Sequence, residues 1–189
     1  ANERIYTADT DGMNWPSQST RVSVVDINSF EFEKTITVSL NPNYIYSDSD
    51  GDVYVICMSD YSDDKSYIVQ RIDAKTDEVK TVEGIKAYKM TVADDIAYIM
   101  FNDYYANEVK YYKYDLKNEK LLSDNFITDG TVVSSPNGIG VDPVTGDIYV
   151  GKSNKKNNGD VYVFSSEGKL KSQFETLPYP ADFVFMTNK

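Results

Sequence analysis

Apolar and polar residues alternate with a period of two along several short stretches of the chain. Clusters of Asp, Asn, Ser, Gly and Pro separate these stretches, and such residues favour turns. No long stretch has the 3.6-residue periodicity of an amphipathic helix. The pattern therefore predicts an all-β protein of short antiparallel strands, with the clearest strands at residues 22–26, 35–38, 67–72 and 160–164.

Four segments of the chain repeat the same order of elements. Each repeat has a first apolar strand, a tight Asp/Gly turn, a second strand centred on an apolar–Tyr pair, a polar loop, a third strand and a fourth strand. The third strands are expected to end at Asp26, Asp73, Asp115 and Ser165, which lie 42 to 50 residues apart. Four strands in a repeat of this length are typical of a β-propeller blade.

We therefore predict an all-β fold, a β-propeller of about four four-stranded blades, or the C-terminal part of a larger ring. The single domain would span residues 1–189, with blades at 1–39, 40–83, 84–130 and 131–176. The first repeat lacks its first strand, and Pro180–Met186 has the pattern of a first strand that no blade follows. We expect this closing strand, within residues 177–189, to pair with the N-terminal strands and close a ring, which would remove exposed strand edges.

Composition and charge narrow the classes of partner. The hydrophobic fraction of 41% over 189 residues is enough for a sizeable core. The formal net charge of −11 disfavours nucleic acid, because duplex binding needs clustered Lys and Arg, and it disfavours anionic lipid surfaces. No apolar run is long enough to predict a transmembrane segment. The single cysteine, Cys57, lies in an apolar run and is expected to be a small buried hydrophobe.

Catalytic signatures are missing from the sequence. The absence of histidine excludes His-dependent triads and His-based metal sites. No phosphate-binding loop, dinucleotide fingerprint or nucleophile elbow is present either, so we expect a protein that is not an enzyme and that has no cofactor. Asp48, Asp50 and Asp52 stand at alternate positions, as at the start of a calcium-binding loop. An ordinary turn is the favoured interpretation, because the Glu that completes such a loop is missing, and calcium is the alternative.

The loops between second and third strands share one face of a propeller with the segments that lead into each blade. Aromatic residues interleaved with Asn and Asp suit a recognition surface, since Tyr and Trp offer contact area and a polar group at low entropic cost. We predict that this face binds a small molecule, a glycan or a protein. Its candidate residues are Trp15, Asn43, Asp60, Tyr61, Asp103, Tyr104, Tyr105, Asn137 and Tyr179.

The segment Pro136–Val150, with its Asp-Pro-x-Thr-Gly turn before an apolar-Tyr-Val strand, resembles the repeats of YncE-like and YVTN β-propellers. The C-terminal half, from Pro136 to Phe185, is more similar still to surface propellers of gut-type bacteria, the DUF5074-like group. The resemblance implies a non-enzymatic, extracytoplasmic binding protein of the periplasm or cell surface. Capture of a corrinoid (vitamin B12) by a surface lipoprotein is one alternative that it implies. Glycan binding or a purely structural role in the cell envelope is another.

This chain has four repeats, whereas members of that group typically have about seven blades. The favoured interpretation is that the chain is the C-terminal part of a longer propeller, because the first repeat starts within a blade and Ala1 is not a translation start. We expect that something has been removed upstream of Ala1, whether a leader, a tag or a larger part of the protein. A four-blade ring is the alternative, and self-association of two such chains to complete a larger ring also stays open.

Overall fold

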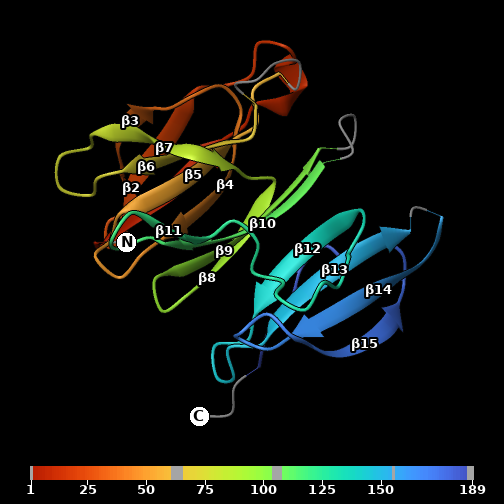
Figure 1. The fold of residues 1–189 in the computed structure, drawn as a ribbon. Coiled ribbons are helices and arrows are strands. Elements are labelled where there is room, and N and C mark those ends of the chain that lie inside the picture. Colours follow the sequence, from red (N-terminus) through yellow and green to blue (C-terminus); the bar gives the residue numbers. More distant parts are fainter. Residues whose placement is uncertain (1, 61–65, 104–107, 155, 187–189) are drawn as a thin grey trace. The chain divides into compact units, whose positions relative to one another are not determined.

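The computed structural model describes residues 2–60, 66–103, 108–154 and 156–186. These residues form fifteen β-strands and one short 3-10 helix, η1 (Gly12–Asn14). The strands make four antiparallel sheets, and each sheet is a meander of strands that follow one another in the sequence (Figure 1). Within the described ranges, no helix has the length and hydropathy that crossing a membrane requires.

The chain divides into two compact units, residues 1–88 and 89–189, and each unit holds two sheets. The first sheet has only three strands, β1 (Arg4–Asp9), β2 (Arg21–Asp26) and β3 (Phe32–Thr37). The second sheet of this unit has four strands, β4 (Pro42–Ser47), β5 (Val53–Cys57), β6 (Ile68–Ile72) and β7 (Val79–Lys86). The first sheet therefore lacks a first strand, as the sequence pattern predicts.

Both sheets of the second unit have four strands. One contains β8 (Lys89–Ala93), β9 (Ile96–Asp103), β10 (Glu108–Asp115) and β11 (Lys120–Ser123). The other contains β12 (Pro136–Val141), β13 (Ile148–Asn154), β14 (Asn157–Phe164) and β15 (Leu170–Thr176). The second sheet of the first unit runs to Lys86 in β7, past the boundary expected at residue 83.

A layer of apolar side chains joins the two sheets of the first unit. Its buried members come from both sheets: Val22, Val24, Ile36 and Val38 on one side and Val53, Val55, Cys57 and Ile72 on the other. The thiol of Cys57 is fully buried, and desolvation raises its pKa to about 12. Cys57 is therefore a small core residue, as predicted, because a thiol with this pKa stays protonated at neutral pH.

The Asp residues at the ends of the third strands shape the turns that follow them. The carboxylate of Asp26 accepts hydrogen bonds from the backbone N–H groups of Ser29 and Asn28, at 2.7 and 2.9 Å, and these bonds lower its pKa. Asp73 makes the same turn with the N–H groups of Thr76 and Lys75. This local bonding explains why Asp recurs there, since its short side chain mimics a backbone turn.

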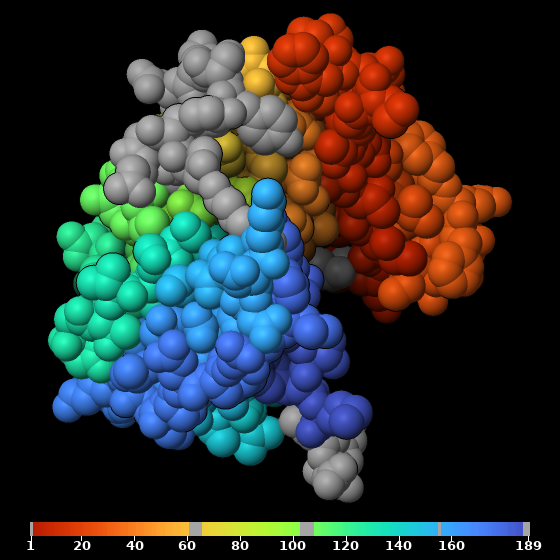
Figure 2. All heavy atoms as spheres, turned by 90° about the vertical axis from the view of Figure 1, so that its right-hand side faces the viewer, coloured from red at the N-terminus to blue at the C-terminus, as the bar shows by residue number. Residues whose placement is uncertain are grey.

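The closing strand expected within residues 177–189 is not formed among the residues described, 177–186. The tail Pro180–Met186 instead lies on one face of the β12–β15 sheet. In Figure 2 the darkest blue atoms, at the end of the described chain, lie beside the lighter blue ones. That face is hollow because glycines occupy it: Gly138 pairs with Gly151 across β12 and β13, and Gly140 lies next along β12.

The tail fits this hollow closely. A Cβ atom at Gly138 would lie 2.6 Å from the carbonyl oxygen of Pro180, and one at Gly140 would lie 2.7 Å from the Cβ of Phe183. The ring of Tyr149 packs against Phe183 and Phe185, at centroid distances of 5.8 and 5.1 Å. These contacts explain why the segment is not a strand of its own sheet: its aromatic residues fill the space that the glycines leave open.

A buried lysine also holds the tail. The ammonium group of Lys89 donates a hydrogen bond to the carbonyl oxygen of Ala181 at 2.6 Å and lies 3.2 Å from the carboxylate of Asp182. Its side chain is only 8% exposed, so the tail supplies partners for a charge that is costly to bury alone.

We predict that Gly138→Ala destabilises the protein by about 1–3 kcal/mol, because the added methyl group pushes the tail out of its seat. The measurement is urea unfolding, in the full chain and in a chain that ends at Leu177. In the shortened chain the substitution should be neutral or slightly stabilising, since alanine restricts the unfolded state more than glycine does. Gly12→Ala, where the nearest atom lies 3.8 Å from the added carbon, is the control. An equal loss in both chains would contradict this account of the tail.

Candidate functional site

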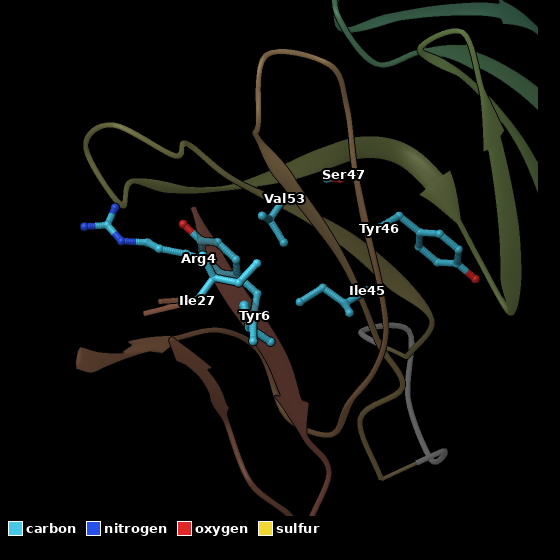
Figure 3. Close-up of a pocket in the computed structure, with 8 residues that line it drawn as sticks. Arg4, Tyr6, Ile27, Ile45, Tyr46, Ser47 and Val53 are labelled. Atoms are coloured by element: carbon cyan, nitrogen blue, oxygen red, sulfur yellow. The ribbon is translucent and has the colours of Figure 1, made fainter. Parts of the chain in front are cut away.

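A pocket of about 370 Å³ opens in the first unit, between β1 and β4 (Figure 3). The side chains of Tyr6, Ile27, Ile45 and Val53 point toward one another there. Its volume lies near the lower end of the range for small-molecule sites. The residues that line it are Arg4, Ile5, Tyr6, Ile27, Ile45, Tyr46, Ser47 and Val53.

The pocket runs along the edges of two strands. β1 and β4 each stand at the edge of their sheet. Three consecutive residues of each strand, 4–6 and 45–47, line the hollow. Consecutive side chains of a strand point to opposite faces of the sheet, so a hollow lined by three in a row follows the strand edge rather than one face.

The polar groups of the pocket favour a neutral occupant. The hydroxyl of Tyr6 is buried and has no hydrogen-bond partner among the described residues. The guanidinium of Arg4 is paired with the carboxylate of Glu33 at 2.9 Å, which raises the pKa of Arg4. Because Glu33 already balances this cation, the remaining polar side-chain groups of the lining are the neutral hydroxyls of Tyr6, Tyr46 and Ser47.

Three predicted recognition residues of the first unit, Trp15, Asn43 and Asp60, lie toward the other end of these strands. The loop that carries Trp15 is tied to the start of β4, since the hydroxyl of Thr10 donates to the carbonyl oxygen of Pro42 at 2.8 Å. The side-chain amide of Asn41 donates to the carbonyl oxygen of Ser59 at 2.9 Å. These bonds bring Trp15, Asn43 and Asp60 to one edge of the unit.

Three predicted residues of the second unit, Asp103, Asn137 and Tyr179, also lie near one edge. The side-chain amide of Asn102, next to Asp103, donates to the carbonyl oxygen of Pro136 at 3.1 Å, and that of Asn137 donates to Pro180 at 3.4 Å. Tyr179, which precedes Pro180, is 53% exposed. The remaining candidates, Tyr61, Tyr104 and Tyr105, lie outside the described residues.

Solved structures match the arrangement of the sheets at low sequence identity. The Dos1 propeller has a TM-score of 0.65 at 13% identity, over 96% of this chain and 46% of that one. The Kuenenia stuttgartiensis hydrazine synthase has a TM-score of 0.62 at 14% identity, over 87% and 48%. A chain of the mitotic checkpoint complex has a TM-score of 0.62 at 10% identity, over 90% and 46%.

The chain has a β-propeller fold. It has four sheets among the described residues, and the first has three strands. The propeller chain spans about half the length of these solved structures. No family model and no curated protein match the sequence, so the resemblance to YncE-like and DUF5074-like propellers stays a prediction.

The acidic segment of the second blade forms a turn between β4 and β5. The carboxylate of Asp48 accepts a hydrogen bond from the backbone N–H of Asp52 at 2.9 Å. The carboxylate of Asp52 pairs with the guanidinium of Arg71 and accepts the N–H of Ala74 at 2.9 Å. In the part of the chain that the structure describes, no three His, Cys, Asp or Glu side chains gather so that they are able to hold a metal ion.

The sequence patterns did not identify the pocket. Its lining comes from two separate parts of the chain, β1 with the residue after β2 and the turn side of β4 and β5. One signal was present, because the first repeat has no first strand beside β1. That omission leaves room at the strand edge, but only the packed structure shows which side chains surround it.

We predict that Asp52→Asn lowers the free energy of unfolding by about 1–3 kcal/mol, because it removes the closer charged partner of Arg71 and leaves only Asp73, at 3.6 Å. Urea unfolding in EDTA and in millimolar calcium is the measurement, and the loss should be the same in both. Asp50→Asn, at an exposed position of the same turn, should change stability by less than about 0.5 kcal/mol. A loss confined to the calcium-containing buffer would instead assign the segment to ion binding.

Proposed function

We propose that this chain is a non-enzymatic, extracytoplasmic propeller that binds a protein partner through the edge of the first unit that carries Trp15. The observation that carries the proposal is the exposure of two large apolar side chains on one short loop. Met13 is 97% exposed and Trp15 is 64% exposed. Both lie between β1 and β2, within or next to η1.

The loop holds these side chains in a defined backbone conformation. The backbone N–H of Asn14 donates to the carbonyl oxygen of Asp11 at 3.1 Å, and that of Ser17 donates to Asn14 at 2.6 Å. The side-chain amide of Asn14 donates to the carboxylate of Asp11 at 2.9 Å. A loop that is already ordered loses less conformational entropy when it binds, which favours recognition.

The chemistry of the two side chains suits a protein surface. Tryptophan is enriched among the residues that contribute most to interfaces, and methionine adapts to irregular surfaces. The net charge of −11 favours a neutral or basic partner surface. The match to a chain of the mitotic checkpoint complex supports protein binding as a use of this fold. The absence of histidine supports a role without chemistry.

Trp15 is the only tryptophan of the chain, so its fluorescence reports on this edge alone. A secreted or periplasmic protein fraction is passed over the immobilised chain and over two variants. We expect one or more proteins to bind the native chain and Val144→Ser, whose exposed apolar residue lies in the turn after β12. The same proteins should be lost from Trp15→Ala.

Titration with each purified candidate should shift the Trp15 emission to shorter wavelength. The affinity of Trp15→Ala, measured by calorimetry, should fall at least about 30-fold, as for an interface residue worth roughly 2 kcal/mol. Equal retention by the native chain and Trp15→Ala would overturn the proposal. A corrinoid and soluble glycans are titrated in parallel, and a Trp15-dependent response to either would replace the protein partner with that ligand.

A further inference from the structure

The edge of β1 that faces away from β2 has the hydrogen-bonding groups of an unpaired strand. The N–H of Ile27 donates to the carbonyl oxygen of Glu3 at 3.0 Å, and the register pairs Ile5 with Val25. In an antiparallel pair, only every second residue of a strand hydrogen-bonds to the neighbouring strand. Glu3, just before β1, and Ile5 within it are such residues, so the backbone groups of Tyr6 and Ala8 point away from β2. No strand of the described residues pairs with β1 on that side.

The second blade shows which strand belongs there. Tyr54 of β5 corresponds to Tyr6, since each follows the first apolar residue of its blade's second strand. In the second blade, β4 covers this edge and places Tyr46 opposite Tyr54 and Tyr44 opposite Ile56. An incoming strand would therefore run antiparallel to β1, with one residue opposite Tyr6 and another, two positions earlier, opposite Ala8.

The pocket lies where this strand would place its side chains. Tyr6 stands opposite Val24 on the face that joins the apolar layer of the first unit. A residue paired with Tyr6 would point to the same face, toward Ile45 and Val53, which line the pocket. The hollow is thus matched to an apolar side chain of an added strand.

The tail of the chain has the pattern of such a strand. Pro180 lies three residues before Phe183, as Pro42 lies before Ile45 and Pro136 before Ile139. Its side chains alternate in exposure. Phe183 and Phe185 face their own sheet, whereas Val184 is 90% exposed and Met186 is 94% exposed. The tail therefore presents an apolar side that nothing described in its own unit covers.

We propose that the free edge of β1 binds the tail of a second copy of this chain as its fourth strand. Val184 then lies opposite Tyr6 and inserts into the pocket, and Asp182 lies opposite Ala8. The partner's Phe183 and Phe185 stay on their own glycine-lined sheet, so the strand arrives already ordered. Reciprocal exchange of two tails gives a symmetric pair.

The length of the solved propellers supports a second copy as the occupant. The chain covers 46% of the Dos1 propeller and 48% of the hydrazine synthase chain, so two copies supply about the length of one such structure. Strand addition of this kind draws its affinity from backbone hydrogen bonds and its specificity from the alternate side chains. The proposal does not depend on the Trp15 loop.

The direct test is a disulfide between the two strands. A hydrogen-bonded antiparallel pair has a Cα–Cα distance of about 5.5 Å, which a disulfide spans. The double variant Ala8→Cys with Asp182→Cys should form a covalent dimer under mild oxidation. Thr7→Cys with Asp182→Cys is the matched control, because Thr7 faces the other side of β1 from Ala8 and should give no dimer. Native Cys57 is fully buried and should not interfere.

The disulfide experiment also distinguishes a strand that comes from a second copy from a strand that comes from the same copy. A covalent dimer in the first variant but not in the second supports exchange between copies. A disulfide within one copy, seen as a monomer of altered mobility on a non-reducing gel, would overturn it. So would the absence of a disulfide, or equal dimers in both variants.

A second measurement does not depend on oxidation. Val184→Asp places a charge opposite Tyr6, and it should fold normally because residue 184 is 90% exposed. Sedimentation equilibrium should show that its dimer is at least about tenfold weaker than the native dimer. Val144→Asp, at a position that is 74% exposed, should associate like the native chain. Equal association of both variants and the native chain, or a native chain that stays monomeric, would overturn the proposal.

Discussion

The apolar layer between neighbouring sheets is the interaction on which the rest of this structure depends. In the first unit, β5 is buried along its whole length, and its residues Val53, Val55 and Cys57 pack against Val22 and Val24 of the preceding sheet. A sheet with buried residues on both faces is not stable alone, because removing that apolar surface from water is the main gain of folding. Each blade therefore needs another element packed against each of its two faces.

Two features of the chain follow from the need to pack both faces of each sheet. In the last blade, Gly138 and Gly140 leave one face hollow, and the tail fills it with Phe183 and Phe185. In the first blade, β1 has no partner strand on one side, and a pocket opens next to it. A strand that is exposed at an edge is a template for another strand. The same constraint that builds the core thus accounts for the position of the tail in the last blade and for the open strand edge of the first blade.

Much of the fold was predictable because the blade pattern is local. The Asp residues that end the third strands mark turns that their own side chains make, and Cys57 is buried because its neighbours are apolar. The place of the tail was not predictable in the same way. Its pattern fits a strand, but its position depends on glycines about 20 to 45 residues earlier. The alternation of Gly138 and Gly140 in β12 was the available signal.

The candidate site likewise has a part that was predictable from the sequence and a part that was not. The loop positions of Trp15, Asn43 and Asp60 follow from the order of strands, whereas the exposure of Trp15 and the lining of the pocket depend on packing between distant segments. Hydrogen exchange of the backbone amides of β1 tests the central claim, that a strand completes the first blade. The account predicts that the amides of Tyr6 and Ala8 exchange fast in dilute solution and become protected as protein concentration rises, while Ile5 and Thr7 stay protected throughout. Protection of Tyr6 and Ala8 that does not change with concentration would contradict it.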